Sequence, residues 1–418
     1  MHVLVISHYF WPEVFRINQL VADLVDRGFD VTVLTGHPNY PEGKFFPGYG
    51  KSWPTREWHP AGYEIIRMPV ISRGGGGSLR LILNYCSFLV SSILMAPWML
   101  RKKQIDVQFV FCTTPPLQGW IALWIKFLRR APVIQWVQDM WPESLSSTGH
   151  VDSRGALRLI GRALTVMYRA SDLVLGQSRS FERMLKPRSG TTPVGYLPNP
   201  GDRAQPSTTL EFELPGEFSV VFAGNIGHAQ ALPTLVEAAE LLRDDSSIHF
   251  TLFGTGSAMK WLKSEIERRQ LRNVTLPGRV PPSAIPGQYA KASALLLTLT
   301  AHEAVSLTVP SKLQSYMAAG RPIIVSADGD TAEIIEDAQA GVAAPAENSE
   351  RLAAAIRQVK SMSLERREIC GRNAKAYYDR HFEPDGVAND LAAFLHQTVQ
   401  AATNERSSRV SSSRGTHL

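Results

Sequence analysis

Residues 219–227 read SVVFAGNIG, and the segment 232–242 that follows them is mostly apolar. A short apolar run before a glycine is typical of a buried strand, and the longer apolar segment indicates a helix. Glycines in such a turn let the backbone approach a phosphate closely, and the helix behind them offers free N–H groups. Two glycines are weak evidence, so a tight turn without a ligand is the alternative. The stretch predicts a βα unit and a candidate phosphate site.

The alternation of strands and helices continues on both sides of this unit. On the carboxyl side we expect strands at 250–253, 274–276, 294–298 and 322–325, and helices at 259–270, 312–319, 350–359 and 386–402. On the amino side we expect strands at 3–6, 31–34, 107–111, 133–137, 173–176 and 194–197, and a first helix at 17–26. Strands that alternate with helices predict parallel sheets, so the fold class is α/β.

A break lies at residues 199–216, which are rich in Pro, Gly, Ser and Thr and have little apolar periodicity. We therefore predict a Rossmann-like domain at 1–200, a second at 217–383 and a final helix at 384–402. The Ser/Arg-rich tail 403–418 is expected to be disordered. Ligands of such sheets bind at the carboxyl ends of the strands, so two domains in tandem predict a central cleft that joins two substrates.

The composition narrows the class of protein. With 44% hydrophobic and 20% charged residues, the chain is expected to fold rather than stay disordered. The three cysteines, Cys86, Cys112 and Cys370, are far apart, which argues against a zinc site or a disulfide framework and fits a reducing compartment. The start at Met1 has the pattern of a buried strand rather than a signal peptide. We see no nucleic-acid recognition motif.

Basic residues next to apolar segments indicate an anionic membrane surface as a partner. They form two clusters, 101–103 and 126–130, which contain Arg101, Lys102, Lys103, Lys126, Arg129 and Arg130. The alternative is a solvated helix end that interacts favourably with the helix dipole. Residues 81–100 carry no charge, and a segment of this length would just span a bilayer. Because several polar residues and Pro97 interrupt the segment, we expect a buried or interfacial helix instead.

The segment VPSKLQSYMAAGRP at residues 309–322 predicts a helix that starts after Pro310 and ends at Gly320. Lys312 stands in its first turn, where a cation opposes the helix dipole. A bound phosphate would resolve that conflict, so Lys312 is a candidate diphosphate ligand. The alternative is an ordinary exposed lysine.

Two further segments follow strands of the first half. Residues 135–144 read QWVQDMWPES, and Asp139 and Glu143 fall at the carboxyl end of a strand, where catalytic groups collect. For Asp139 the alternative is a cap of the turn before Pro142. The loop FWPEVFR at 10–16 follows the first strand. Its Arg16 could contact a donor or acceptor phosphate, or have a structural role.

Taken together and in this order, these segments resemble the retaining GT-B glycosyltransferases of family 4. The closest likeness is to the bacterial branch that acts in O-antigen, capsule, exopolysaccharide and colanic-acid synthesis and includes the L-fucosamine (N-acetyl-L-fucosamine) transferases. The resemblance runs from the first strand to about Ala402. The features that carry it are PE at 12–13, GHPNYP at 36–41, QDMWPES at 138–144, GNIG at 224–227, PSK at 310–312 and AAGRP at 318–322.

The resemblance implies two Rossmann-like domains facing a central cleft, and a final helix that crosses back onto the first. It implies a UDP-sugar donor and, with the basic clusters, an undecaprenyl-diphosphate-linked saccharide acceptor. The protein would be cytoplasmic and peripheral on the inner face of the plasma membrane. Lys312 would neutralise the leaving diphosphate, and no metal or other cofactor would be required. The residues implied on the donor side are Gly224, Asn225, Gly227, His228, Arg279, Ser311 and Ser315. Those implied on the acceptor side are Glu13, Arg16 and Gln138.

This chain departs from the family's pattern at both of its usual glutamates, where it has Leu307 and Ser315. Ser315 or Gln314 would then hold the ribose, and Glu303 is the candidate substitute near the donor sugar. Phe15-Arg16 stands where the family has Gly-Gly, and Gln138 stands where it often has a histidine.

The mechanism that the resemblance implies has no protein nucleophile. The diphosphate leaves beside Lys312, the acceptor hydroxyl attacks on the same face, and Asp139 orients the sugar or acceptor. The catalytic candidates are therefore Asp139, Lys312 and Glu303. Two alternatives remain open, a non-hydrolysing sugar-nucleotide epimerase and a non-catalytic GT-B partner subunit.

Overall fold

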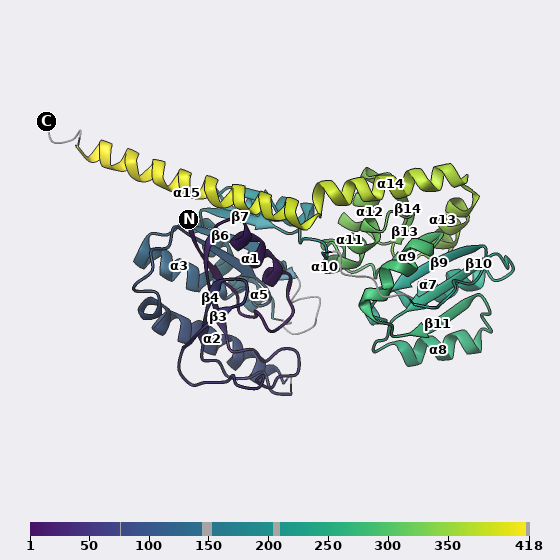
Figure 1. The fold of residues 1–418 in the computed structure, drawn as a ribbon, viewed down its shortest axis with the longest axis horizontal. Helices are drawn as coiled ribbons and strands as arrows, with labels where there is room; N and C mark the ends of the chain where they lie inside the picture. The colour runs from purple at the N-terminus through teal and green to yellow at the C-terminus, as the bar shows by residue number, and fades with distance from the viewer. Residues whose placement is uncertain (76, 144–152, 204–209, 415–418) are drawn as a thin grey trace. The chain divides into compact units, whose positions relative to one another are not determined.

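The computed structural model describes all of the chain except residues 76, 144–152, 204–209 and 415–418 (Figure 1). The chain divides into two compact units. Unit 1 contains Met1–Pro200 together with Val387–Leu418, and unit 2 contains Gly201–Gly386. In the predicted linker 199–216, Leu210, Phe212 and Leu214 pack against a hydrophobic cluster of unit 2, so part of that segment belongs to unit 2.

Unit 1 is built on an eight-stranded sheet of order β3-β4-β2-β1-β5-β6-β7-β8. All neighbours pair in parallel except the edge hairpin β3–β4. Its strands are β1 His2–Ile6, β2 Asp30–Gly36, β3 Thr55–His59, β4 Tyr63–Met68, β5 Val107–Cys112, β6 Val133–Val137, β7 Leu173–Gly176 and β8 Val194–Tyr196. Its helices are α1 Arg16–Asp26, α2 Ser78–Met99, α3 Gln118–Arg129, α5 Arg154–Arg169 and α6 Arg179–Ser189. The chain reverses its direction across the sheet between β1 and β5, which marks the switch point.

Unit 2 has a six-stranded parallel sheet of order β11-β10-β9-β12-β13-β14. Its strands are β9 Phe218–Ala223, β10 Ile248–Phe253, β11 Val274–Gly278, β12 Ala294–Thr298, β13 Ile323–Ser326 and β14 Gly341–Ala344. Its helices are α7 Leu232–Leu241, α8 Met259–Arg268, α9 Ile285–Lys291, α10 Glu303–Ser306, α11 Ser311–Ala318, α12 Asp330–Asp337, α13 Ser349–Ser361 and α14 Leu364–His381, with short 3₁₀ turns η1 His228–Gln230 and η2 Pro282–Ala284. The switch point lies between β9 and β12, at the glycine turn of residues 224–227.

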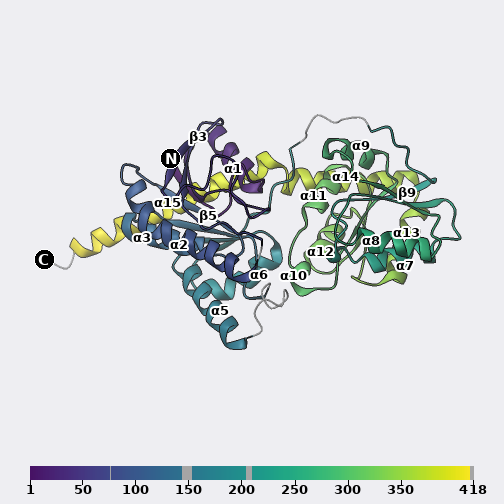
Figure 2. The ribbon, with the colours of Figure 1, turned by 90° about the horizontal axis from the view of Figure 1, so that it is seen from below.

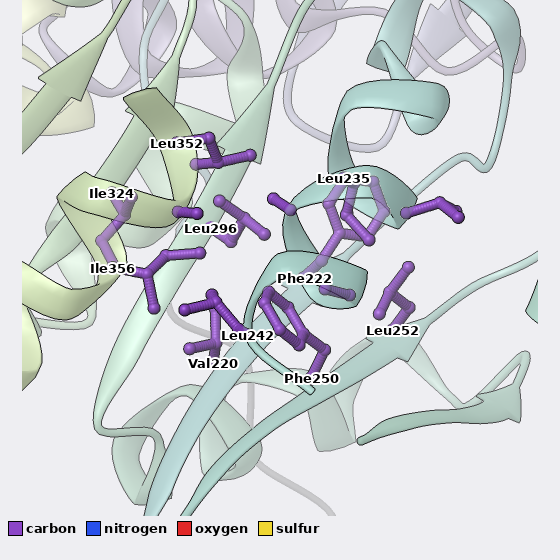
Figure 3. Packing of buried hydrophobic residues seen from close by; sticks show 14 of the residues in the cluster. Val220, Phe222, Leu235, Leu242, Phe250, Leu252, Leu296, Ile324, Leu352 and Ile356 are labelled. Atoms are coloured by element: carbon purple, nitrogen blue, oxygen red, sulfur yellow. The ribbon is translucent and has the colours of Figure 1, made fainter. Parts of the chain in front are cut away.

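The core of unit 2 explains why that turn is fixed. Phe222 and Val220 of β9 pack against Leu235 of α7 and against Phe250 and Leu252 of β10 (Figure 3). All five side chains are buried. Because these contacts pack β9 against α7, they fix both ends of the loop that joins the two elements.

The last helix, α15, spans Pro384–Arg414 and is drawn in yellow in Figure 1. Its residues Val387, Ala388, Leu391 and Leu395 are buried in a hydrophobic cluster of unit 1. The prediction of a disordered tail at 403–418 is therefore wrong for 403–414, while 415–418 lie outside the described residues. In this part of the helix the Arg406 guanidinium donates to the carbonyl of Arg130 in unit 1.

Helix α2 is the one helix in the described part of the chain that is long and apolar enough to cross a membrane, although only 22% of its most apolar window is buried. Asn84, Phe88, Ser92 and Ala96 form its buried face. The opposite stripe, at helical spacing, is exposed and consists of Leu79, Ile82, Leu83, Val90, Leu94 and Trp98. Helix α2 is therefore buried on one face and exposed along an apolar stripe on the other.

Candidate functional site

The glycine turn of unit 2 interlocks with a second glycine loop. Gly224 has φ 141° and Gly254 has φ 135°, values that side chains other than glycine rarely adopt. A Cβ on Gly254 would lie 1.9 Å from the Gly224 carbonyl oxygen. The Ile226 N–H donates to the Thr255 carbonyl at 3.0 Å, and the Ala258 N–H donates to the Ile226 carbonyl at 3.0 Å. Loops 224–227 and 254–258 therefore hold each other at the carboxyl ends of β9 and β10.

We expect Gly254→Ala to lower the free energy of unfolding by about 3 kcal/mol, because the added methyl group combines backbone strain with a clash against Gly224. Gly278→Ala is the matched control. Gly278 also has a positive φ, but a Cβ there would meet nothing within 4 Å. It should cost only about 1 kcal/mol of strain. Denaturant unfolding of both variants is the measurement, and equal losses would show that the loops do not interlock.

Lys312 lies against this turn. It stands in the first turn of α11, whose N-cap, Pro310, supplies no side-chain hydrogen bond. The Lys312 Nζ donates to the Gln230 Oε1 at 2.6 Å and lies 3.6 Å from the ring centroid of Phe222. A Cβ on Gly224 would be 2.8 Å from the Lys312 Cε. Among the described residues no carboxylate pairs with the ammonium group.

Burial of this unpaired ammonium group lowers the pKa of Lys312 to about 7. A cation kept near an uncapped helix N-terminus, beside an exposed glycine turn, is an arrangement that favours an anionic ligand. Sequence reasoning missed Gln230. Its only signal was its position at the end of the loop that follows GNIG.

The other predicted donor residues are distributed around the turn. Gly224, Asn225 and His228 are exposed and Gly227 is buried. His228 lines a hollow of about 510 Å³ with Trp261 and Glu347. Ser311 is exposed at the start of α11, and the Ser315 Oγ donates to the Ser311 carbonyl at 3.3 Å.

The structure does not bring Arg279 and Glu303 into contact with Lys312. Arg279 is exposed just after β11. Glu303 is exposed in the first turn of α10, where His302 is the N-cap and its Nδ1 accepts from the Ala304 N–H. The structure thus gathers Gly224, Gln230 and Lys312, and leaves Arg279 and Glu303 as predictions.

In unit 1, Asp139 links two loops at the carboxyl ends of β5 and β6. Its Oδ2 accepts from the Thr114 N–H at 2.9 Å and from the Thr114 hydroxyl at 2.7 Å. The Trp141 indole donates to the same hydroxyl at 3.2 Å. Asp139 therefore has a structural role in the loop, and its Oδ1 is not engaged by any described residue. Glu143 instead pairs with the Arg188 guanidinium. Ser144 lies outside the described residues.

Gln138 belongs to a buried amide cluster at the carboxyl ends of β6 and β7. Its Oε1 accepts from the Asn199 Nδ2 at 2.9 Å, and its carbonyl accepts from the Gln177 Nε2 at 3.1 Å. The Gln138 Nε2 is buried without a hydrogen-bond partner among the described residues. Sequence reasoning missed Gln177 and Asn199, since a single amide in a loop carries no pattern.

Glu13 is a brace between loops rather than an exposed carboxylate. Its Oε1 accepts from the N–H groups of Asn39 at 2.8 Å and Tyr40 at 2.7 Å, and its Oε2 accepts from the Phe10 N–H at 3.1 Å. Burial raises the pKa of Glu13 to about 7, although these N–H groups and Arg67 act to lower it. Both carboxylate oxygens of Glu13 therefore accept hydrogen bonds from the backbone, and its contact with the acceptor stays a prediction. Arg16 is half-buried in the first turn of α1.

No group of three or more His, Cys, Asp or Glu side chains in the described ranges is arranged to hold a metal ion.

Comparison with protein families gives two adjacent matches. Residues 14–200 match the family described as Glycosyl transferase 4-like domain, and residues 211–377 match Glycosyl transferases group 1. The chain is 25% identical over 354 residues to the Escherichia coli K12 colanic acid biosynthesis glycosyl transferase WcaI. The aligned residues make up 79% of this chain and 84% of that protein. It is 21% identical over 237 residues to WcaL of the same organism, which covers 55% of this chain and 56% of that protein.

Solved structures share the architecture. Sucrose-phosphate synthase from Thermosynechococcus elongatus aligns with a TM-score of 0.69 and 15% identity, covering 96% of this chain and 99% of that one. Anabaena HepE in complex with UDP aligns with a TM-score of 0.66 and 15% identity, covering 95% of this chain and all of that one. At these identities the likeness shows the fold, which is that of the GT-B structures.

Proposed function

We propose that the chain, whose residues 14–200 and 211–377 match two glycosyl transferase families and whose fold is GT-B, transfers a sugar from a UDP-sugar to a lipid-linked saccharide with retention of configuration. The acceptor class is an undecaprenyl-diphosphate-linked saccharide of O-antigen, capsule or exopolysaccharide synthesis. N-acetyl-L-fucosamine is the first sugar to test, and the similarity to WcaI supports the pathway class.

The observation that carries the donor part is the ammonium group of Lys312 beside Gly224 and the N-terminus of α11. A diphosphate at this place would supply the missing counter-charge and accept hydrogen bonds from the first N–H groups of the helix. The same groups would stabilise the negative charge that develops on the leaving UDP. In the proposed reaction the Lys312 ammonium group and the N-terminus of α11 stabilise this charge without a metal ion. Anabaena HepE, which has the same fold, was solved with UDP.

The proposed reaction breaks the bond between the anomeric carbon and the diphosphate oxygen, and the acceptor hydroxyl attacks on the same face. Its proton passes to the departing diphosphate, so no protein nucleophile is needed. In unit 1 the Oδ1 of Asp139 and the Nε2 of Gln138 have no partner among the described residues, and we propose that these groups orient the acceptor sugar.

We propose that a lipid bilayer covers the exposed stripe of α2. Helix α3 lies beside α2 (Figure 2) and extends this surface. The Trp124 indole donates to the Ile93 carbonyl, and Phe127 is 77% exposed. Of the basic residues near it, Lys103 pairs with Glu64 and Lys126 with Asp172. Arg101, Lys102 and Arg130 are exposed and fit anionic headgroups. A peripheral site on the inner face of the plasma membrane would give access to the lipid-linked acceptor.

The affinity for UDP should fall as the pH rises above 7. The free protein has a Lys312 whose pKa is about 7, and a bound diphosphate would raise that pKa by supplying a counter-charge. Binding therefore takes up a proton above pH 7, and we expect up to about tenfold weaker binding per pH unit above it. Calorimetry at pH 6.5, 7.5 and 8.5 in two buffers measures affinity and proton uptake. A Lys312→Gln variant should show neither effect, and a pH-independent wild-type affinity would contradict the role of Lys312.

The test of the function is incubation of the full chain with UDP-sugars and a synthetic undecaprenyl-diphosphate-linked saccharide. Transfer of the sugar with retained anomeric configuration is the expected result, and the product is read by mass spectrometry and NMR. An isomerised donor would instead identify an epimerase. Neither product across the UDP-sugars tested would favour a non-catalytic subunit and overturn the proposal.

A further inference from the structure

Arg73 differs from Arg67, another arginine of unit 1, because most of its side-chain donors have no partner among the described residues. A guanidinium group has five N–H donors. Arg67, which is fully buried, uses them on Glu57 and on the carbonyls of Gly36 and Trp11. The side chain of Arg73 makes one hydrogen bond to the described residues, from Nη1 to the Tyr9 hydroxyl at 2.6 Å, and pairs with no carboxylate among them.

Aromatic rings hold this guanidinium group in place. It lies 5.5 Å from the ring centroid of Tyr9, 5.1 Å from that of Tyr40 and 6.0 Å from that of Tyr85. Cation–π contacts of this length are attractive, and they leave the N–H edge of the fork free for an oxyanion. The group is thus positioned without being neutralised, which is the state of a preorganised anion site.

The backbone of Arg73 is fixed by the motif at 36–41. The Arg73 N–H donates to the Asn39 Oδ1 at 3.0 Å, and the Gly74 N–H donates to the Gly43 carbonyl at 2.9 Å. Glu13 in turn holds the N–H groups of Asn39 and Tyr40. The Pro12-Glu13 and 36–41 motifs therefore converge on one structural result, the placement of Arg73 beyond the carboxyl ends of β1, β2 and β4.

A buried histidine beside Arg73 has one ring nitrogen without a hydrogen-bond partner among the described residues. His8 follows β1, is 4% exposed, and its Nε2 has no hydrogen-bond partner among the described residues. Its ring lies 4.4 Å from that of Tyr9 and 5.6 Å from that of Tyr85. This unsatisfied nitrogen is a second observation that points to a polar ligand in the same aromatic cluster.

The segment that carries Arg73 is fastened to the apolar helix α2. The Asn84 Nδ2 donates to the Ile71 carbonyl at 2.6 Å, and the Ile71 N–H donates to the Ser87 Oγ at 2.9 Å. Ile71, Leu79 and Leu83 are all exposed next to this attachment. A charged anion site therefore adjoins an uncovered apolar surface, and a ligand that is both anionic and apolar would satisfy both.

We propose that Arg73, in its cage of Tyr9, Tyr40 and Tyr85, binds the phosphate group of an isoprenoid-diphosphate acceptor whose chain lies along α2. This inference deepens the proposed function and rests on it only for the identity of the acceptor. Arg73 is assigned to binding, and the transfer step does not pass through it.

The experiment measures binding of geranyl diphosphate to the full chain by calorimetry, with UDP at saturating concentration so that the Lys312 site is filled. We expect Arg73→Gln to weaken binding at least about tenfold, because charge-assisted hydrogen bonds to phosphate are lost. Arg73→Lys keeps the charge but loses the forked guanidinium donors, so its affinity for geranyl diphosphate should lie between those of the wild type and Arg73→Gln. Arg80→Gln is the matched control, since Arg80 lies on the neighbouring turn and donates only to Ser72. It should change the affinity less than about threefold, as expected for an exposed surface charge.

Two further probes separate lipid phosphate from free phosphate. Inorganic pyrophosphate should bind much more weakly than geranyl diphosphate, and geraniol should not compete. An equal affinity for pyrophosphate would overturn the lipid part, and unchanged geranyl diphosphate binding by Arg73→Gln would overturn the site. UDP affinity should stay the same in all variants. If Arg73→Gln loses geranyl diphosphate binding while the wild-type chain transfers no sugar, the proposed function alone is contradicted. Transfer with an unchanged acceptor KM in Arg73→Gln would sink this inference alone.

Discussion

Replacing Lys312 with alanine is expected to lower sugar transfer about a thousandfold, because the variant loses the cation that faces the leaving diphosphate. The loss should fall mainly on kcat, since negative charge on the diphosphate grows as the bond to the sugar breaks. Lys263→Ala is the matched control, because Lys263 is exposed on α8. Turnover of Lys312→Ala within tenfold of the wild type would reject the assignment.

A second substitution at this position, Lys312→Met, should raise the free energy of unfolding although it also removes the cation. A lysine whose pKa is about 7 in the folded chain carries a penalty that is present below pH 7 and disappears as the pH rises towards the value of the unfolded chain. Lys312→Met removes the charge and keeps the apolar stem against Phe222. Each pKa unit corresponds to about 1.4 kcal/mol, so at pH 7 we expect a gain on the order of a few kcal/mol. Denaturant unfolding at pH 7 and pH 10 measures it, and the gain should shrink at pH 10.

The second large effect concerns membrane binding. Leu79, Leu94 and Phe127 are 72%, 70% and 77% exposed on the α2–α3 surface. Burying a large apolar side chain contributes about 1.5–3 kcal/mol, so replacing all three with serine should weaken binding to phosphatidylglycerol vesicles more than about a hundredfold. Vesicle co-sedimentation of the full chain is the measurement, and higher salt should weaken the wild type further because Arg101, Lys102 and Arg130 are exposed.

The control for this surface is a triple variant of exposed leucines elsewhere. Leu159, Leu241 and Leu364 are 69%, 47% and 66% exposed on α5, α7 and the start of α14. Their replacement with serine should leave vesicle binding within about twofold, as surface changes away from the binding face do. Equal losses in both triple variants would mean that α2 and α3 have no special contact with the bilayer.

Local sequence patterns predicted much of the fold because neighbouring residues fix it. β1, β9 and β12 contain unbroken apolar runs, and buried Gln108 and Gln135 are the single polar residues of β5 and β6, as expected for strands buried on both faces. The hairpin β3–β4 was missed because its first strand, TREWH, is half-exposed and charged. Helix α14 was missed because only Cys370, Gly371, Ala374 and Tyr378 of its 18 residues are buried, which leaves too narrow an apolar stripe.

The candidate site divides in the same way. The sequence alone pointed to Lys312, since a cation in the first turn of a helix conflicts with the dipole. It could not show that Gln230, 82 positions earlier, would meet the Lys312 ammonium group, because that contact depends on the switch point of the sheet. For Glu13 the sequence left the direction of the side chain open, and the fold turned it onto the backbone of Asn39 and Tyr40.

By itself, then, the sequence determined the α/β class, the order of most strands and the residues whose chemistry conflicts with their local setting, because these depend on contacts within a few positions. Only the tertiary structure decided which polar groups end without a partner. Arg73 shows the reason, since its carbonyl and aromatic surroundings come from residues 9, 39, 40 and 85. Whether a charge is neutralised depends on residues that are far apart in the sequence, and these surround it only once the sheet has assembled.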